Sequence, residues 1–261
     1  MKKVKLFFLA ALAVILLTGC KGDEPETQQL YKVGDYYPDP KAVYSDGELQ
    51  SGTAAIGIVY WLDTAVQGYK TATKSGPSGK IVSLDEVSNY LAWGPYGIET
   101  GATSPTDGLA NMEVIKELDN TFSDYPAFAW VDQKNGAAGT TTYASGIKGI
   151  WYLPAVAEVQ YLLCAVVGKS YETWGFQGSD DSGIYSYLPS FNQEANRIDL
   201  SSFNAKLTSV GVLPFSADGY RSATEVSASS TWNVYFDRGI TDSNYKHNSN
   251  SSCRIRCVRA F

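Results

Sequence analysis

Patterns typical of strands occur near the beginning and the end of the chain. Residues 54–63 are rich in Ile, Val, Tyr and Trp and predict a buried strand, and residues 79–84 predict its hairpin partner. Residues 232–237 alternate strictly between apolar and polar side chains, which predicts a half-buried strand. Its inward-facing residues are Trp232, Val234 and Phe236.

Two segments between these strands have helical periodicity. The first covers residues 109–118 and follows Thr106 or Asp107, either of which can cap its N-terminus. The second covers residues 153–167, has a Pro in its first turn, and is followed by Gly168 as the C-terminal cap. Its predicted buried stripe consists of Val156, Val159, Leu163 and Val166 or Val167. These elements predict an α+β domain with two helices packed on small antiparallel sheets and joined by long loops.

The first 30 residues predict export and lipid anchoring. Lysines precede an apolar run that ends in Leu-Thr-Gly followed by Cys20, which resembles a lipobox and predicts a signal peptide over residues 1–19. The run is shorter than the ~20 apolar residues of a spanning helix. We therefore expect acyl chains on Cys20 to hold the protein at a membrane, although an ordinary signal peptide with a chance Cys is the alternative. Residues 20–30 predict an acidic tether that resembles the surface-export signal of some Gram-negative lipoproteins, which favours the outer membrane and its exposed leaflet.

The charge of the mature chain limits its partners. Removal of the signal peptide takes away three lysines and changes the formal net charge from −6 to −9. An acidic protein is a poor general ligand for nucleic acid or for an anionic membrane surface. With 24 Gly and 18 Tyr, the sequence has the composition of a loop-rich extracytoplasmic protein, and its length favours a single domain over residues 31–261.

Several patterns that bind cofactors or carry out catalysis in other proteins are incomplete here. Residues 76–80 lack the first Gly and the Ser or Thr of a phosphate loop, and residues 178–183 lack regular calcium-ligand spacing, so a hairpin turn and a solvated turn are favoured. His247 lies in a polar run that predicts exposure rather than a fixed catalytic base. We therefore expect neither a cofactor nor a metal, and no enzymatic activity.

The cysteines beyond Cys20 do not form a clear disulfide pattern. Cys253 and Cys257 are predicted on one face of a single strand, about 13 Å apart, which is too far for a bridge. A bridge from Cys164 to Cys257 is conceivable, but buried free thiols are favoured because Cys packs as a small hydrophobe.

The outward face of the C-terminal strands predicts a ligand-binding surface. It combines Tyr with Ser and Asn, as antibody combining sites do, because Tyr gives rigid contact area and the small polar residues adapt their hydrogen bonds. An ordinary solvated loop is the alternative. The predicted binding residues are Arg221, Ser227, Ser229, Asn233, Tyr235, Asp237, Thr241, Ser243, Asn244, Tyr245, His247 and Asn248.

Four blocks of the sequence resemble the Lcl C-terminal domain family. They are Gly57 to Asp63, Trp151-Tyr152-Leu153-Pro154 with Glu158, Tyr220 to Glu225, and Ile255 to Phe261. The resemblance implies a C-type-lectin-like fold, and some proteins of that fold with this ending are targets of diversity-generating retroelements. The calcium-dependent sugar motifs of true C-type lectins are absent, so calcium-mediated sugar binding is not supported.

Charged residues within these blocks have two interpretations. Glu158, Glu225, Arg256 and Arg259 recur in the family and could form a ligand site. The favoured interpretation is that they form ion pairs and caps that connect the last strand to the second helix.

The sequence thus predicts a surface lipoprotein with an adhesin-type domain whose ligand is a glycan or a surface protein. A structural or pilus-associated envelope assembly protein is the alternative, and an enzyme is the least supported class.

Overall fold

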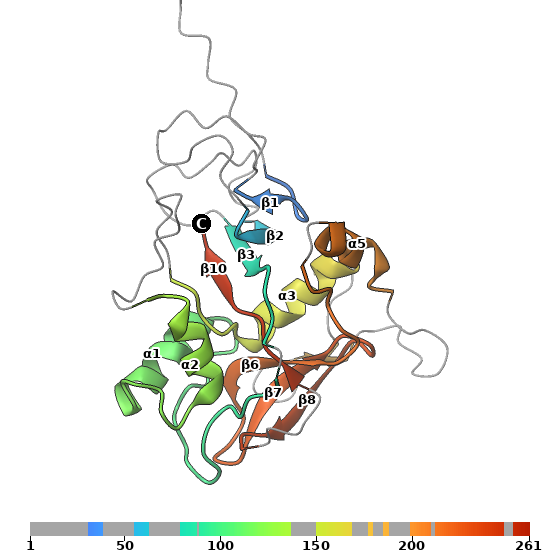
Figure 1. Cartoon of the computed structure of the whole chain (residues 1–261). Helices are drawn as coiled ribbons and strands as arrows, with labels where there is room; N and C mark the ends of the chain where they lie inside the picture. Colours follow the sequence, from blue (N-terminus) through green and yellow to red (C-terminus); the bar gives the residue numbers. More distant parts are fainter. Residues whose placement is uncertain are drawn as a thin grey trace, which may run out of the picture.

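The computed structural model places residues 31–38, 55–62, 79–87, 89–136, 150–168, 177–179, 185–187, 199–209, 212–247 and 253–261. These residues form two separate sheets and several helices, which confirms the α+β class. Figure 1 shows the smaller sheet above the larger one, with a helix between them.

The smaller sheet is antiparallel and brings the two ends of the described chain together. Its order is β1 (Tyr36–Tyr37), β2 (Gly57–Leu62), β3 (Gly79–Ser83) and β10 (Val258–Ala260). Strands β2 and β3 pair with Ile58 opposite Val82, so the predicted hairpin partnership is confirmed. Both of these side chains are fully buried.

The larger sheet contains the C-terminal strands. Its order is β4 (Gln177–Ser179), β5 (Tyr185–Tyr187), β8 (Ile240–Tyr245), β7 (Ser230–Tyr235), β6 (Gly219–Glu225) and β9 (Cys253–Arg254). All neighbours are antiparallel except β6 and β9, which are parallel.

The prediction that Cys253 and Cys257 share one strand is wrong. Cys253 belongs to β9 of the larger sheet, whereas Cys257 directly precedes β10 of the smaller one. The chain changes sheets between them, where the carbonyl of Ile255 accepts a hydrogen bond from the amide of Val87 at 3.2 Å. Among the residues that the structure places, Cys164, Cys253 and Cys257 are buried free thiols, as predicted.

The described helices are α1 (Gly108–Leu118), α2 (Pro126–Gln133), α3 (Val156–Val166) and α5 (Ser201–Ser209). Asp107 caps α1, accepting a hydrogen bond from the amide of Ala110 at 3.0 Å, as predicted. Helix α3 begins three residues later than expected because Ala155 is its N-cap, and the carboxylate of Glu158 accepts the Ala155 amide at 2.8 Å. Helices α2 and α5 were not predicted.

Helix α3 lies between the two sheets and forms the centre of the core (Figure 1). Its predicted stripe of Val156, Val159, Leu163 and Val166 is at most 1% exposed. Its polar residue Gln160 is also buried and donates a hydrogen bond to Thr241 of β8 at 2.8 Å. None of the helices described here is long and apolar enough to span a bilayer.

Candidate functional site

The predicted binding surface does not form one continuous exposed face. Arg221, Asn233 and Thr241 are at most 5% exposed, so the prediction that they face solvent is wrong. Val234 and Phe236 point into the core as predicted, but Trp232 is only partly buried. The alternation of side chains along the strand was therefore inferred correctly. The face of the sheet that carries Asn233 is nevertheless buried as well, instead of being open to solvent. Asn248 lies outside the described residues.

Arg221 illustrates why this face is closed. Its guanidinium group donates hydrogen bonds to the hydroxyl of Thr231 and to the carbonyl of Tyr245, both at 3.4 Å. Burial lowers the pKa of Arg221, while the nearby Cys253 and Tyr235 act to raise it. Arg221 is a buried structural residue of the sheet.

The remaining predicted residues separate into two groups at opposite ends of the β7–β8 ladder. Tyr235 pairs with Ile240 at one end, and Tyr245 pairs with Ser230 at the other. Five residue steps separate the two tyrosines, or about 17 Å along the strands. They therefore cannot belong to one compact contact surface, contrary to the prediction.

The group around Tyr235 is half-buried. Its ring lies 4.3 Å from the guanidinium carbon of Arg238, and Asp237 forms an ion pair with the same arginine at 3.5 Å. Burial raises the pKa of Tyr235 to about 12. Ser243 is exposed in the middle of β8, and Asn244 directs its amide toward the sulfur of Cys253 at 3.6 Å.

The group around Tyr245 forms an exposed aromatic cluster, which we define as Tyr96, Tyr245 and His247. The ring of Tyr96 lies 6.1 Å from that of Tyr245 and 5.1 Å from that of His247, and the last two are 5.8 Å apart. Tyr96 is 58% exposed and Tyr245 is 55% exposed. Large aromatic rings that remain in solvent while contacting each other form a ready contact surface.

Apolar and hydroxyl side chains on the same loops extend this cluster. Ile98 and Val226 are also exposed, and Ser227 and Ser229 lie on the hairpin that joins β6 to β7. The hydroxyls of Ser227 and Ser230 are 2.9 Å apart, which closes the hairpin tightly. Figure 1 shows this hairpin beside the loop before α1, and the amide of Gly97 donates to the carbonyl of Ala228 at 2.9 Å.

Lys246 fixes the aromatic cluster to the domain. Its side chain is fully buried, and its ammonium group forms an ion pair with Glu225 and donates to the carbonyl of Ile98 at 2.6 Å. The carbonyl of Lys246 accepts the amide of Trp93 at 2.7 Å. Because Tyr245 and His247 are its immediate neighbours, the buried Lys246 determines where both exposed rings lie.

Glu225 holds the other side of the same loop. Its carboxylate accepts hydrogen bonds from the amide and hydroxyl of Thr100 and from the amide of Gly101, at 2.8 to 3.0 Å. Burial acts to raise the pKa of Glu225, but the hydrogen bonds from Lys246, Thr100 and Gly101 outweigh it and lower the pKa. The carboxylate therefore remains charged at neutral pH.

The loop that carries Tyr96 is also held where the backbone of Gly94 packs closely against the ring of Tyr125. A Cβ atom on Gly94 would lie 2.5 Å from a ring carbon of Tyr125, so only glycine fits there. The ring of Trp93 is fully buried and donates its indole N–H to the carbonyl of Ser222 at 3.0 Å. The loop that carries Tyr96 is thus anchored on both sides.

The charged residues of the family-like blocks are interior and structural. Glu158 forms an ion pair with Lys80 of β3, accepts the hydroxyl of Tyr152 at 2.8 Å and caps α3. Tyr152 in turn pairs with Val258 of the last strand, so the interpretation as a connecting ion pair and cap is confirmed for Glu158.

Arg256 and Arg259 are also interior. Arg256 pairs with the buried Glu86 at 2.9 Å, and Arg259 lies 5.8 Å from the centre of the Trp151 ring. Both arginines are 2% exposed, so they are in no position to meet a ligand at the surface.

Within the part of the chain that the structure places, no group of three or more His, Cys, Asp and Glu side chains could hold a metal ion. The acidic residues of the calcium candidate over residues 178–183 lie outside the described side chains.

Tyr96, Ile98 and Val226 were missed by the sequence analysis. Tyr96 follows Gly94-Pro95 and precedes Gly97, a pattern that predicts a surface turn with an aromatic residue at its tip. That pattern could have marked Tyr96 as exposed, but only the pairing of loops far apart in the sequence places it beside Tyr245.

Comparison with protein-family models gives no match, and comparison with curated proteins gives none either. Among solved structures, the chain is similar to a fimbrial protein from Bacteroides ovatus, with a TM-score of 0.47 and 19% sequence identity. The matched region covers 88% of this chain and 49% of the fimbrial protein. The chain therefore spans about half the length of the fimbrial protein.

Proposed function

We propose that this protein is a surface-anchored lipoprotein. Its domain would bind a protein on the surface of another cell through the aromatic cluster. The observation that carries this proposal is the contact among three exposed rings, those of Tyr96, Tyr245 and His247, on a rigid base. Surface aromatics are costly to expose, and Tyr in particular is enriched where proteins meet. Cys20 would supply the membrane anchor, and binding rather than catalysis would be the task of the domain.

The chemistry of the cluster favours a protein as ligand over a glycan. Ile98 and Val226 add exposed aliphatic side chains on the two loops joined by the Gly97–Ala228 hydrogen bond, and the hairpin that carries Val226 also carries Ser227 and Ser229. An apolar centre with a polar rim is the usual composition of a protein interface. The buried Lys246–Glu225 pair holds the rings in place before binding, which reduces the entropy lost on association.

The test uses the mature chain with a fluorescent label and panels of intact epithelial and bacterial cells. We expect saturable binding to at least one cell type that protease treatment of the cells removes and glycosidase treatment does not. Tyr96→Ala and Tyr245→Ala should each weaken it by about 30-fold, the size of a hot-spot truncation. Their melting temperatures should change little, because both side chains are exposed.

Tyr235→Ala is the matched control, because Tyr235 lies at the far end of the same strand pair. Its binding should equal that of the unchanged chain. Loss of binding after glycosidase treatment would identify a glycan ligand instead. Normal binding by Tyr245→Ala would place the contact surface elsewhere on the domain. Self-association that Tyr245→Ala abolishes would favour an assembly subunit.

A further inference from the structure

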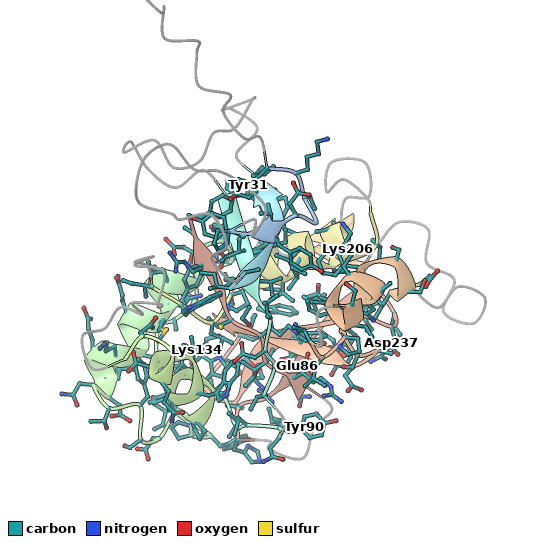
Figure 2. The ribbon with its side chains drawn as sticks, turned by 45° about the horizontal axis from the view of Figure 1, so that its top comes forward. Tyr31, Glu86, Tyr90, Lys134, Lys206 and Asp237 are labelled. Atoms are coloured by element: carbon teal, nitrogen blue, oxygen red, sulfur yellow. The ribbon has the colours of Figure 1, made fainter. Side chains whose placement is uncertain are left out.

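A second surface feature, remote in sequence from the C-terminal strands, is an open cleft of about 600 Å³ between α2 and the segment that follows β3. In Figure 2, Lys134 marks the end of α2 and Glu86 marks the opposite segment. The volume is within the range of small-ligand sites, ~300–1,000 Å³. Its lining consists of Asp85, Glu86, Val87, Asn89, Leu91, Thr121, Phe122, Ser123, Pro126, Ala129, Trp130 and Gln133.

One stripe of α2 forms a wall of this cleft. Pro126, Ala129, Trp130 and Gln133 follow the spacing of a single helical face, and all four line the cleft. The opposite stripe of the helix, with Phe128 and Val131, is fully buried in the core. Burial of one stripe fixes α2, so the Trp130 side chain is held at the cleft by the fold itself.

The end of the cleft is a turn with a fixed conformation. Phe122 has a φ of 54°, a left-handed backbone that costs a non-glycine residue ~1–2 kcal/mol. Asp119 supports it by accepting hydrogen bonds from Thr121, Ser123 and Asp124 at 2.8 to 3.1 Å. The Asp124 amide is the main cause that lowers the pKa of Asp119 to about 2. Because Thr121 and Ser123 donate their hydroxyl protons to Asp119, their oxygens remain able to accept hydrogen bonds at the cleft.

The acidic side chains of the lining are already neutralised by cations. Asp85 forms an ion pair with Lys134. Glu86 pairs with Arg254 and Arg256, both at 2.9 Å, and accepts the hydroxyl of Tyr220 at 2.8 Å. A charged ligand would therefore find no unmatched charge in the lining to compensate the loss of its hydration.

Neutral polar groups of the lining are available. The indole N–H of Trp130 and the side-chain amides of Asn89 and Gln133 make no hydrogen bond to another residue in the described part of the chain. The ammonium group of Lys134 lies 4.6 Å from the centre of the Trp130 ring and helps to hold it in place. Leu91, Val87 and Ala129 add an apolar surface beside these groups.

We propose that this cleft is a binding site for a neutral saccharide. A sugar ring presents an apolar C–H face to an indole and carries hydroxyls around its edge. The lining offers the matching groups: an indole with adjoining aliphatic side chains, two free amides and two hydroxyl oxygens. The site is separate from the aromatic cluster and does not depend on it.

The test uses the mature chain with Cys20→Ala and two sets of probes at millimolar concentration. The neutral set is glucose, galactose, mannose, N-acetylglucosamine and their disaccharides; the charged set is glucuronate and glucosamine. NMR would record the tryptophan indole N–H signals, with that of Trp130 identified by its loss in Trp130→Phe. We expect at least one neutral sugar to shift the Trp130 signal in a saturable manner.

Substitutions in the cleft should weaken this binding. Isothermal titration calorimetry would measure the affinity of these variants, because those without Trp130 lack its NMR signal. Trp130→Ala should reduce the affinity by about 30-fold, and Gln133→Ala by about fivefold, which corresponds to one neutral hydrogen bond. Glu117→Ala, on the exposed surface of α1, is the control and should not change the affinity. Gln133 is itself exposed, so this variant should fold even if Trp130→Ala does not.

Three outcomes would overturn the proposal. They are the absence of any shift of the Trp130 signal with neutral sugars, a preference for the charged set, and unchanged affinity in Gln133→Ala and Trp130→Ala. Normal sugar binding by Tyr245→Ala would support two independent sites. Loss of sugar binding in Tyr245→Ala would contradict the separate cleft.

Discussion

The ammonium group of Lys246 and the carboxylate of Glu225 form an ion pair in which both side chains are almost completely removed from solvent, at 0% and 2% exposure. Lys246 follows the last residue of β8 and Glu225 ends β6, so the pair joins two strand ends to the loop before α1. A buried charge needs a partner, because its desolvation costs several kcal/mol. The exposed rings of Tyr245 and His247, which flank Lys246 in the sequence, are therefore held in position by a buried ion pair.

Breaking this pair should destabilise the domain strongly. Glu225→Gln leaves the ammonium group of Lys246 buried without an opposite charge, and we expect the free energy of unfolding to fall by ~3–5 kcal/mol. Chemical denaturation would measure it. The double variant with Lys246→Met should lose less than the sum of the two single variants, since no unpaired charge remains. Lys116→Met removes an exposed pair with Asp132 and, as the control, should cost at most ~1 kcal/mol. A loss below ~1 kcal/mol for Glu225→Gln would contradict the role of the pair.

The same pair predicts how stability depends on pH. The folded pKa of Glu225 is lower than the ordinary 4.5, so its contribution is fully present above that value and is lost as the pH falls through the folded pKa. The difference in unfolding free energy between the unchanged chain and Glu225→Gln should thus be constant near neutral pH and shrink in acid. Denaturation curves at several pH values would measure it. A difference that grows on acidification would show that the carboxylate is destabilising when charged.

Local signals in the sequence were sufficient to predict several elements of the fold. A helical stripe after Thr106 and Asp107 predicted α1 with one of these two residues as its cap, and two apolar runs predicted the β2–β3 hairpin. These elements are determined by neighbouring residues, because capping and strand alternation act over a few positions. The short α2 was missed because its eight residues include Pro, Phe, Trp and Val, which are weak helix formers.

The candidate site depends on contacts that no local pattern encodes. Alternation predicted that Asn233 points away from Val234, which holds, but not that this second face is also buried. Likewise, Lys246 lies in a polar run of the sequence and is nevertheless fully buried, since its partner Glu225 comes from another strand. The composition of the C-terminal region suggested a binding surface, while its position at one end of the sheet required the structure.

Lipid anchoring makes a prediction about Cys20. If the lipobox-like sequence is processed, Cys20→Ala should abolish the incorporation of labelled palmitate and release the protein from membrane fractions. A substitution of the buried Cys164, such as Cys164→Ala, is the control and should leave both unchanged. Membrane retention of Cys20→Ala, with no acyl mass on the N-terminal peptide of the unchanged chain, would exclude this anchor.

Trp151 and Trp232 should differ in their effect on stability. Trp151 is 1% exposed, and its backbone amide donates to Asn135 at 2.7 Å. Trp151→Ala should cost ~3–5 kcal/mol, as expected for a large buried aromatic. Trp232 is only partly buried at the edge of the core, so Trp232→Ala should cost less, roughly 1–3 kcal/mol. Phe236→Ala, on the same face of the strand but fully buried, should match Trp151→Ala. Urea denaturation of the three variants would give this order. An equal cost for Trp232→Ala would mean that this partly exposed ring is packed as tightly as the fully buried rings.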